Sequence, residues 1–212
     1  MFERPAMPLD PVDLSELSLY PISERKSLVS ADILKPPDGV PRDLAGAAVM
    51  MSDSDAAGTL DRLATHIVEA HMGSKCVAVG MGAHAIKLGL GPHLADLVRR
   101  GIVTSVAMNG ATAFHDLELA LFGVTSEDVA AALPAGRFGF ADEPSAAFNE
   151  AAIAAQKSGR GLGEALGELV SARATEERQS YSLLAACYNA GIPTTVHLCI
   201  GTDVLNMHPR AD

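Results

Sequence analysis

Apolar residues recur along this chain with two different periods, which predict helices alternating with strands. Between about residue 52 and residue 71 they fall on one face at helical spacing. The residues of that face are Leu60, Leu63, Ala64, Ile67 and Val68. Ser52, Asp53 and Ser54 suit the capping position before this helix, and Gly73 ends it. We therefore expect an amphipathic helix that ends near His71.

The same periodicity predicts five more helices. They cover about 83–100, 114–122, 129–134, 143–157 and 162–189, the last with a break near 171–175. Thr125 and Ser126 suit the start of the third of these helices. Gly101 and Gly191 follow predicted helices, at the position where a left-handed residue commonly stands.

Three short apolar runs, at 76–80, 102–109 and 194–200, predict β-strands. Strands that are apolar almost throughout are typical of a parallel sheet covered by helices. Their alternation with helices predicts an α/β fold, an open, doubly wound, mostly parallel sheet with helices on both faces. A closed eight-stranded barrel is not expected, because it usually needs about 250 residues.

Residues 1–43 are rich in proline and follow no regular pattern, apart from one strand-like piece, SLVSADIL, at 27–34. The apolar residues among the prolines favour an arm that packs on the body or on a neighbouring subunit. We expect this proline-rich arm to precede a single α/β domain over 44–212.

Composition narrows the class of protein. A chain of 212 residues, 48% hydrophobic and 20% charged, can form one domain with a sizeable core. A net charge of −10 disfavours a nucleic-acid or anionic-membrane surface, and no apolar run approaches the ~20 residues of a membrane span. Cys76, Cys187 and Cys199 match no zinc spacing, so we expect buried, reduced thiols in a soluble, cytoplasmic protein.

Polar segments follow all three predicted strands, at 80–87, 109–116 and 200–209. Ligands of open α/β sheets bind beside the carboxyl ends of the strands, which share one edge when the strands are parallel. The polar side chains delivered there are His84, Lys87, Asn109, His115, Asp116, Asp203 and His208. The pattern therefore predicts a ligand site at this edge.

The first segment, GMGAHA at 80–85, matches G-x-G-x-x-A between a strand and a helix. Such a turn lets a phosphate approach the backbone and the unpaired N–H groups of the helix. A dinucleotide site also requires an acidic residue about 20 positions later, at the end of the next strand. In this sequence that strand ends in Asn109 instead. The turn thus fits either a dinucleotide site or a structural connection, and so does the small-residue turn Asn109-Gly110-Ala111.

His115 and Asp116 are expected at the start of a helix. There the helix dipole would keep His115 neutral, which suits proton transfer or metal binding. Asp116 would orient His115 or only cap the helix. Asp203 would hold a ribose hydroxyl, an amine or a metal, or form an Asx turn. Lys87 would neutralise a phosphate or lie in solvent.

Two other classes of function stay open. A metal-dependent hydrolase or lyase would use His84, His115, Asp116 and Asp203, although no metal motif such as HExxH or CxxC occurs, and we assign no metal ligands. The other open class is a non-catalytic, oligomeric ligand-binding protein.

Two stretches together resemble deoxyhypusine synthases: GMGAHAIKLGLGPHLADLVRRGIVTSVAMNGATAFHDLELAL at 80–121 and EALGELVSARATEERQSYSLLAACYNAGIPTTVHLCIGTD at 164–203. In that family a glycine-rich loop and helix are followed by a T-A-G-G-x-E-E-D loop and, later, by an I-P-V-F strand with a T-D-G loop. The resemblance spans roughly 76–205.

The resemblance implies a Rossmann-like sheet in a dimer or tetramer that binds NAD between subunits. It implies three cofactor loops, which contain Ala83, His84 and Lys87 in the first, Asn109, Gly110 and Ala111 in the second, and Thr202 and Asp203 in the third. The glycine pattern described above adds Gly80 and Gly82 to the first loop as expected cofactor-binding residues. Phe114 and His115 replace the acidic pair before Asp116, and the family's reactive lysine would lie beyond Asp212. Either the chain is a shortened form, or this branch does not perform the family's reaction. We therefore expect an NAD-binding enzyme for a small, amine-containing substrate, with His115, Asp116 and Asp203 as catalytic residues, and do not assign it the family's own activity.

Overall fold

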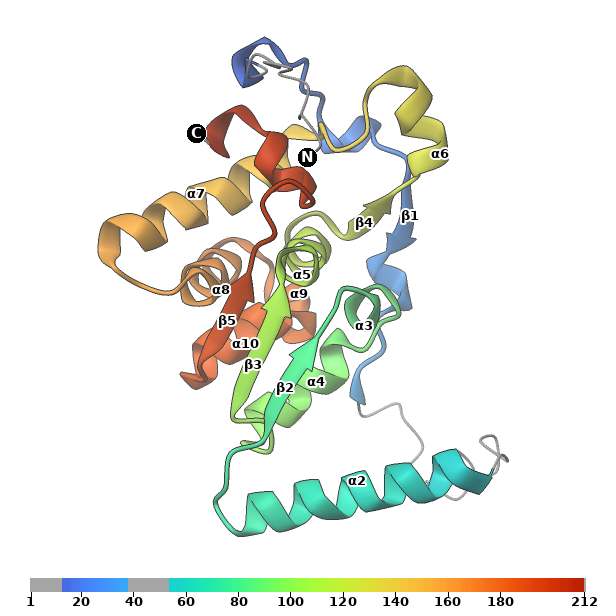
Figure 1. Cartoon of the computed structure of the whole chain (residues 1–212), viewed down its shortest axis with the longest axis vertical. Helices are drawn as coiled ribbons and strands as arrows, with labels where there is room; N and C mark the ends of the chain where they lie inside the picture. The colour runs from blue at the N-terminus through green and yellow to red at the C-terminus, as the bar shows by residue number, and fades with distance from the viewer. Residues whose placement is uncertain (1–12, 38–53, 212) are drawn as a thin grey trace, which may run out of the picture.

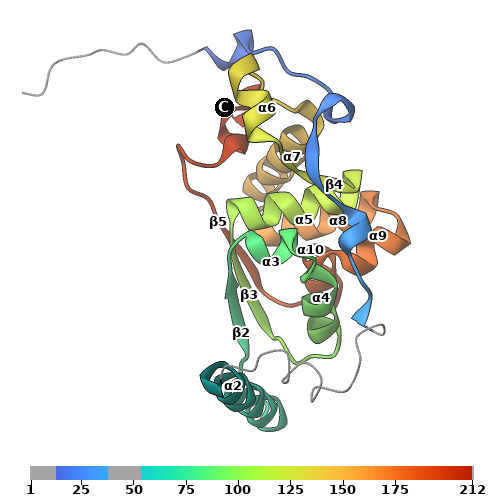
Figure 2. The same cartoon turned by 90° about the vertical axis from the view of Figure 1, so that its right-hand side faces the viewer.

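The protein is described here by a computed structural model, which covers residues 13–37 and 54–211 (Figure 1, Figure 2). Its centre is a three-stranded parallel sheet of order β2-β3-β5, made of β2 (Ala78–Met81), β3 (Ser105–Asn109) and β5 (Thr194–His197). A smaller antiparallel pair joins β1 (Ser27–Ser30) to β4 (Val124–Glu127). The predicted α/β class and the parallel sheet are confirmed.

Helices supply most of the remaining structure. The α-helices are α2 (Ser54–Met72), α3 (His84–Lys87), α4 (Gly91–Arg99), α5 (Gly110–Phe122), α6 (Val129–Ala132), α7 (Asp142–Ser158), α8 (Leu162–Arg173), α9 (Glu176–Tyr181) and α10 (Leu183–Ala190). Short 3-10 helices are η1 (Leu14–Glu16), η2 (Ile22–Glu24), η3 (Ala31–Ile33), η5 (Leu133–Ala135), η6 (Val204–Met207) and η7 (Pro209–Ala211).

Several helix ends follow from local chemistry as predicted. Gly101 and Gly191 adopt left-handed conformations after α4 and α10, with φ of 68° and 65°. The predicted break near 171–175 lies at Ala174, between α8 and α9. A further break occurs at Ser182, whose hydroxyl caps α10 by accepting from the Ala185 N–H at 3.1 Å. The predicted caps at 52 and 53 lie outside the described residues.

Three helix predictions were wrong. The expected helix at 83–100 is two helices, because Gly89 takes φ of +85° between α3 and α4. Helix α5 begins at Gly110 rather than near residue 114, because the Asn109 side chain accepts from the Thr112 N–H at 2.9 Å and caps it. Thr125 and Ser126 belong to β4, and Asp128 caps the helix that follows.

The core lies on one face of the parallel sheet. Helices α4, α5, α8 and α10 cover that face, as Figure 2 shows from the side, and enclose aliphatic side chains together with Phe148. The opposite face carries Ala78, Gly80, Thr195 and His197, which are all exposed. Among the described residues the predicted helices on both faces are therefore not found, and the strands alternate between buried and open sides.

The N-terminal arm packs on the body over its described part, as predicted. Strand β1 pairs with β4, and the Tyr20 N–H donates to the Phe140 carbonyl at 3.1 Å. Helix α2 instead stands off the body beside the amino ends of the sheet strands (Figure 1). Among the described helices, none has the length and apolar content needed to cross a membrane.

The cysteine prediction was correct for one residue of three. Cys187 is buried in the core, and burial raises the pKa of its thiol to about 11. Cys76 and Cys199 are exposed, and each lies outside the sheet, two residues before β2 and two residues after β5 respectively.

Candidate functional site

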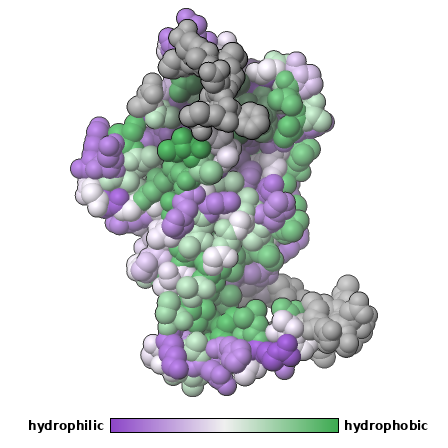
Figure 3. Space-filling view, in the orientation of Figure 1, coloured by the Kyte–Doolittle hydropathy of each residue, from purple (hydrophilic) through white to green (hydrophobic). Residues whose placement is uncertain are grey.

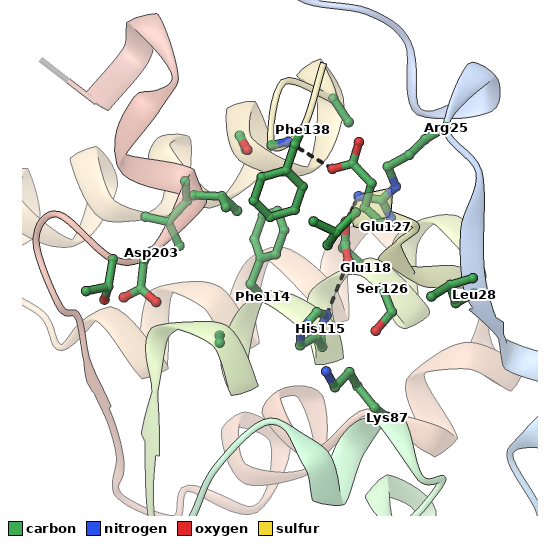
Figure 4. Close-up of a pocket in the computed structure, with 18 residues that line it drawn as sticks. Arg25, Leu28, Lys87, Phe114, His115, Glu118, Ser126, Glu127, Phe138 and Asp203 are labelled. Atoms are coloured by element: carbon green, nitrogen blue, oxygen red, sulfur yellow. Dashed lines mark hydrogen bonds and ion pairs between the residues drawn. The ribbon is translucent and has the colours of Figure 1, made fainter. Parts of the chain in front are cut away.

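A cavity of about 410 Å³ lies beside the carboxyl edge of the sheet, within the size range of small-molecule sites (Figure 4). Helix α5 supplies one wall, the arm and β4 supply another, and the segment before η6 closes the side opposite them. The surface inside it is mostly apolar, with the rings of Phe114 and Phe138 in its middle. Sequence segments more than 100 residues apart thus form one site.

A chain of hydrogen bonds runs from the cavity into the protein through His115. Its Nδ1 atom lies 2.6 Å from the Thr125 hydroxyl, which donates to the Glu118 carboxylate at 2.5 Å. The other Glu118 oxygen accepts from Arg25, whose side chain is 4% exposed. Glu118 is itself buried, so the ion pair with Arg25 balances its charge inside the protein.

This chain determines which nitrogen of His115 holds the proton. A threonine hydroxyl has one hydrogen, and Thr125 uses it on Glu118, so its contact with His115 must be an N–H of the imidazole donating to the oxygen. Nδ1 is therefore protonated in neutral His115. Nε2 keeps its lone pair and is available to accept a proton at the cavity.

Two residues that line the cavity each have a buried polar side-chain atom without a hydrogen-bond partner within the described structure. These atoms are Nη2 of Arg25 and the hydroxyl oxygen of Ser126. Ser126 also has φ of 60°, which is uncommon for a residue other than glycine. Unpaired buried groups of this kind require an explanation, and a water molecule or a ligand that pairs with them would supply one.

The charged groups around the cavity differ in whether they have hydrogen-bond or ion-pair partners within the protein. Glu127 accepts from the Tyr20 hydroxyl at 2.5 Å and from the Gly139 N–H at 2.9 Å. Asp203 accepts from the Cys199 N–H at 2.9 Å. The Lys87 ammonium group, in contrast, has no hydrogen-bond or ion-pair partner in the described structure, and Lys87 lines the same cavity as His115 (Figure 4). The donors without a partner therefore belong to Arg25, Lys87 and Ser126, while the carboxylates of the cavity have partners.

The three polar segments predicted from the sequence do meet at the carboxyl edge of the sheet. The Thr112 hydroxyl donates to the Met81 carbonyl at 3.4 Å, which joins the first two segments, and Gly110 contacts the Asp203 side chain. Five predicted site residues line the cavity: Lys87, Ala111, His115, Thr202 and Asp203. Seven do not: Gly80, Gly82, Ala83, His84, Asn109, Gly110 and Asp116.

The first two predicted phosphate loops differ in access. A side chain at Gly80 or Gly82 would meet no atom within 4 Å, and neither glycine has a positive φ, so the fold does not require glycine there. At Gly110 an added Cβ would overlap the Asp203 carboxylate and lie 2.8 Å from Leu198 Cδ2. A carboxylate thus occupies the start of α5, where a phosphate of a dinucleotide would otherwise bind.

Asp116 does not face the cavity. It is buried and accepts from the Ser182 hydroxyl at 2.6 Å and from the Leu183 and Leu184 N–H groups at 3.0 Å, so it caps the start of α10. Burial raises the pKa of this carboxyl, and the three donors oppose that shift. Its predicted catalytic role is replaced by a structural one.

His115 lies in the second turn of α5, because the helix begins at Gly110. The premise that placed it at the positive end of a helix was therefore wrong. Its acidic neighbour is Glu118 rather than Asp116, since residues three apart share a helix face and adjacent residues do not. That spacing was the one sequence signal for Glu118, whereas no local pattern pointed to Arg25 or Thr125.

The metal hypothesis gains no support from the geometry. In residues 13–37 and 54–211, no three His, Cys, Asp or Glu side chains come close enough to hold a metal ion. His208 pairs with Asp142 at 3.0 Å, outside the cavity.

Neither a protein-family model nor a curated protein matches this sequence. The relation to deoxyhypusine synthases therefore stays a prediction.

Proposed function

We propose that the cavity binds a small molecule with an anionic group and an apolar body, and that His115 moves a proton on that molecule. The observation that carries the proposal is the pair of buried, unpartnered groups at its wall, Arg25 Nη2 and the Ser126 hydroxyl. Leaving such a group buried and unpaired costs about 1–3 kcal/mol, which an accepting oxygen of a ligand would recover.

A carboxylate or phosphate suits this wall better than a neutral acceptor. Arg25 gives one donor to Glu118 and retains Nη2, so its guanidinium can serve both the protein and a ligand oxygen. Lys87 adds a second positive charge at the same cavity. The apolar body of the ligand would lie against Phe114 and Phe138.

His115 would act as a general base and then as a general acid. Its Nε2 lone pair would take a proton from the bound molecule, while the Nδ1–H stays on Thr125. Glu118, reached through the Thr125 hydroxyl, would stabilise the resulting imidazolium. The same nitrogen would then return the proton to the product.

The resemblance to deoxyhypusine synthases supports a second candidate, an NAD-binding enzyme with a Rossmann-like, doubly wound sheet. The converging strand ends and the open turn at Gly82 favour it. The Asp203 carboxylate against Gly110 disfavours a pyrophosphate at the second loop, because two anions would share that place. We therefore derive no chemical step through NAD and rank the smaller anionic ligand first.

The test is thermal unfolding with three probes: 3-phenylpropionate, AMP and NAD. A ligand at 100 times its dissociation constant stabilises the fold by about 2.7 kcal/mol, or about 5–11 °C for a chain of this size. Ser126→Ala and Lys87→Gln should weaken binding of 3-phenylpropionate or AMP, while Lys157→Gln, an exposed lysine on α7, should not. Gly82→Ala should weaken binding of NAD alone.

His115→Ala should fold and still bind the probe, because Arg25, Ser126 and Lys87 remain. No shift with any probe, or equal binding by Ser126→Ala, Lys87→Gln and the control, would refute the proposal. Unfolding of His115→Ala would identify that residue as structural.

A further inference from the structure

The three carboxylates that line the cavity differ in whether the protein occupies both of their oxygens. Both oxygens of Glu118 and both oxygens of Glu127 accept hydrogen bonds from neighbouring groups. Asp203 accepts with Oδ2 alone, from the Cys199 N–H at 2.9 Å. Across residues 13–37 and 54–211, its Oδ1 atom has no hydrogen-bond donor and no cation forms an ion pair with it. Asp203 can therefore accept a further donor at the cavity.

This open acceptor and the unpaired donors lie at opposite ends of the cavity. Figure 4 shows Asp203 on one side of the rings of Phe114 and Phe138. Arg25 and Ser126, which carry the unpaired donors, lie on the other side of the rings. The cavity thus has a donor end, an aromatic middle and an acceptor end.

The acceptor end lies nearer to the surface than the donor end. Asp203 belongs to the segment between β5 and η6, where Figure 3 shows hydrophobic side chains at the surface, and Ile200 in that segment is 90% exposed. Asp203 itself is half-buried, whereas the Arg25 side chain is 4% exposed. Solvent would therefore partly screen a charged ligand group at Asp203.

The charges of the lining side chains favour a cation at the acceptor end. Arg25 and Lys87 are positive and three carboxylates are negative, so the lining carries one net negative charge when His115 is neutral. A ligand with only an anionic group would add a second negative charge, and like charges repel more strongly in a partly closed cavity than in water. Within the described chain no three His, Cys, Asp or Glu side chains are grouped to hold a metal ion, so an ammonium group suits this end best.

We propose that the ligand carries an ammonium group in addition to its anionic group, and that Oδ1 of Asp203 binds the ammonium. This inference rests on the proposed function and narrows its ligand to amino acids whose two charged groups are separated by an apolar body. The α-ammonium and α-carboxylate of a common amino acid share one carbon, so they cannot lie on opposite sides of the Phe114 and Phe138 rings. Binding at both ends would hold the ligand in one direction against His115, which favours proton transfer at a single position.

The first test compares related carboxylates by titration calorimetry of the full chain at pH 7. They are 3-phenylpropionate, its para- and meta-aminomethyl derivatives, and its para-hydroxymethyl derivative, which adds a group of similar size without a charge. At least one aminomethyl derivative should bind about tenfold more tightly than 3-phenylpropionate, near the lower end of what a hydrogen bond to a charged group contributes. The hydroxymethyl derivative should bind about as tightly as 3-phenylpropionate. The gain should be smaller in about 0.5 M salt than in about 0.05 M salt, because salt screens a half-buried pair.

The second test asks whether Asp203 holds the ammonium. Asp203→Asn keeps the shape of the side chain and an oxygen for the Cys199 N–H, so it should fold and bind 3-phenylpropionate, but the gain of the aminomethyl derivative should be lost. Asp96→Asn is the control, because it removes a carboxylate of α4 outside the cavity, and it should keep the gain. A gain that persists in folded Asp203→Asn would overturn the inference.

The possible results separate this inference from the proposed function. If 3-phenylpropionate or AMP binds and neither aminomethyl derivative gains affinity, the anionic ligand stands and the ammonium site is refuted. If none of the probes binds, both are refuted. Should Asp203→Asn fail to fold, the wild type still decides, because equal binding of the aminomethyl and hydroxymethyl derivatives refutes the ammonium site.

Discussion

The buried ion pair between Arg25 and Glu118 should hold the N-terminal arm to α5. Two substitutions probe it: Glu118→Gln, which keeps the shape of the side chain, and Arg25→Met, which keeps much of its length. Each removes one charge and leaves the other inside the protein, where the Arg25 side chain is 4% and the Glu118 side chain 1% exposed.

The expected losses are large because each remaining charge is almost completely shielded from water. Breaking a buried pair by removing one partner costs about 3–5 kcal/mol, a substantial part of the 5–15 kcal/mol that keeps a typical domain folded. The double variant leaves no unpaired ion, so it should lose less than the sum of the single losses. We expect a coupling energy of about 2–3 kcal/mol.

The assay is urea unfolding of the four proteins at pH 7, followed by circular dichroism. Asp96→Asn serves as the control, since it breaks an exposed pair with Arg100 and should cost less than about 1 kcal/mol. Additive losses in the double variant would show that the two charges do not interact, and a single variant as stable as the control would refute the burial argument.

Glu118→Gln carries a second consequence for the site. A glutamine amide can donate to the Thr125 hydroxyl, which would then turn its hydrogen toward Nδ1 of His115. The neutral imidazole would hold its proton on Nε2 and lose its basic atom at the cavity. Nitrogen NMR of the imidazole should show this change of tautomer, and an unchanged tautomer would contradict the hydrogen-bond chain.

Two further predictions concern pH and packing. Burial, together with the hydrogen bond to Glu127, raises the pKa of Tyr20 to about 12 from its ordinary value of 10.0. Because this pKa is higher in the folded protein than in the unfolded chain, the protonated Tyr20 contributes stability below pH 10, and that contribution is lost as the pH rises to 12. Between pH 8 and pH 11.5 the free energy of unfolding in urea should therefore fall less in Tyr20→Phe than in the wild type. Equal falls in the two proteins would contradict this prediction. Gly163→Ala should lower the free energy of unfolding in urea by about 1–3 kcal/mol, because the added Cβ would overlap the Thr194 carbonyl oxygen. The control is Gly161→Ala, whose Cβ would meet no atom within 4 Å and which should lose less than about 1 kcal/mol. Similar losses in both variants would disprove close packing of α8 on β5.

Features that depend on neighbouring residues could be predicted from the sequence. Helical periodicity located α7 and the break between α8 and α9, and glycines marked the ends of α4 and α10, because these signals arise within a few residues of backbone. The apolar runs located the strands of the parallel sheet for the same reason. Their parallel direction then implied a shared carboxyl edge, which correctly brought Lys87, His115 and Asp203 to one cavity.

The tertiary structure decided which of these residues face the ligand and which support the fold. Asp116 and Glu118 are both close to His115 in the sequence, but they lie on different faces of α5. Asp116 therefore reaches the start of α10, while Glu118 reaches Arg25. Arg25 reaches the cavity from an arm more than 90 residues away in sequence. The open sheet face also went unpredicted, because apolar and small residues suit a covered strand equally well whether the covering layer belongs to the same chain or to another. Hydrophobic burial is non-directional, so the pattern of apolar residues can require a partner without naming it.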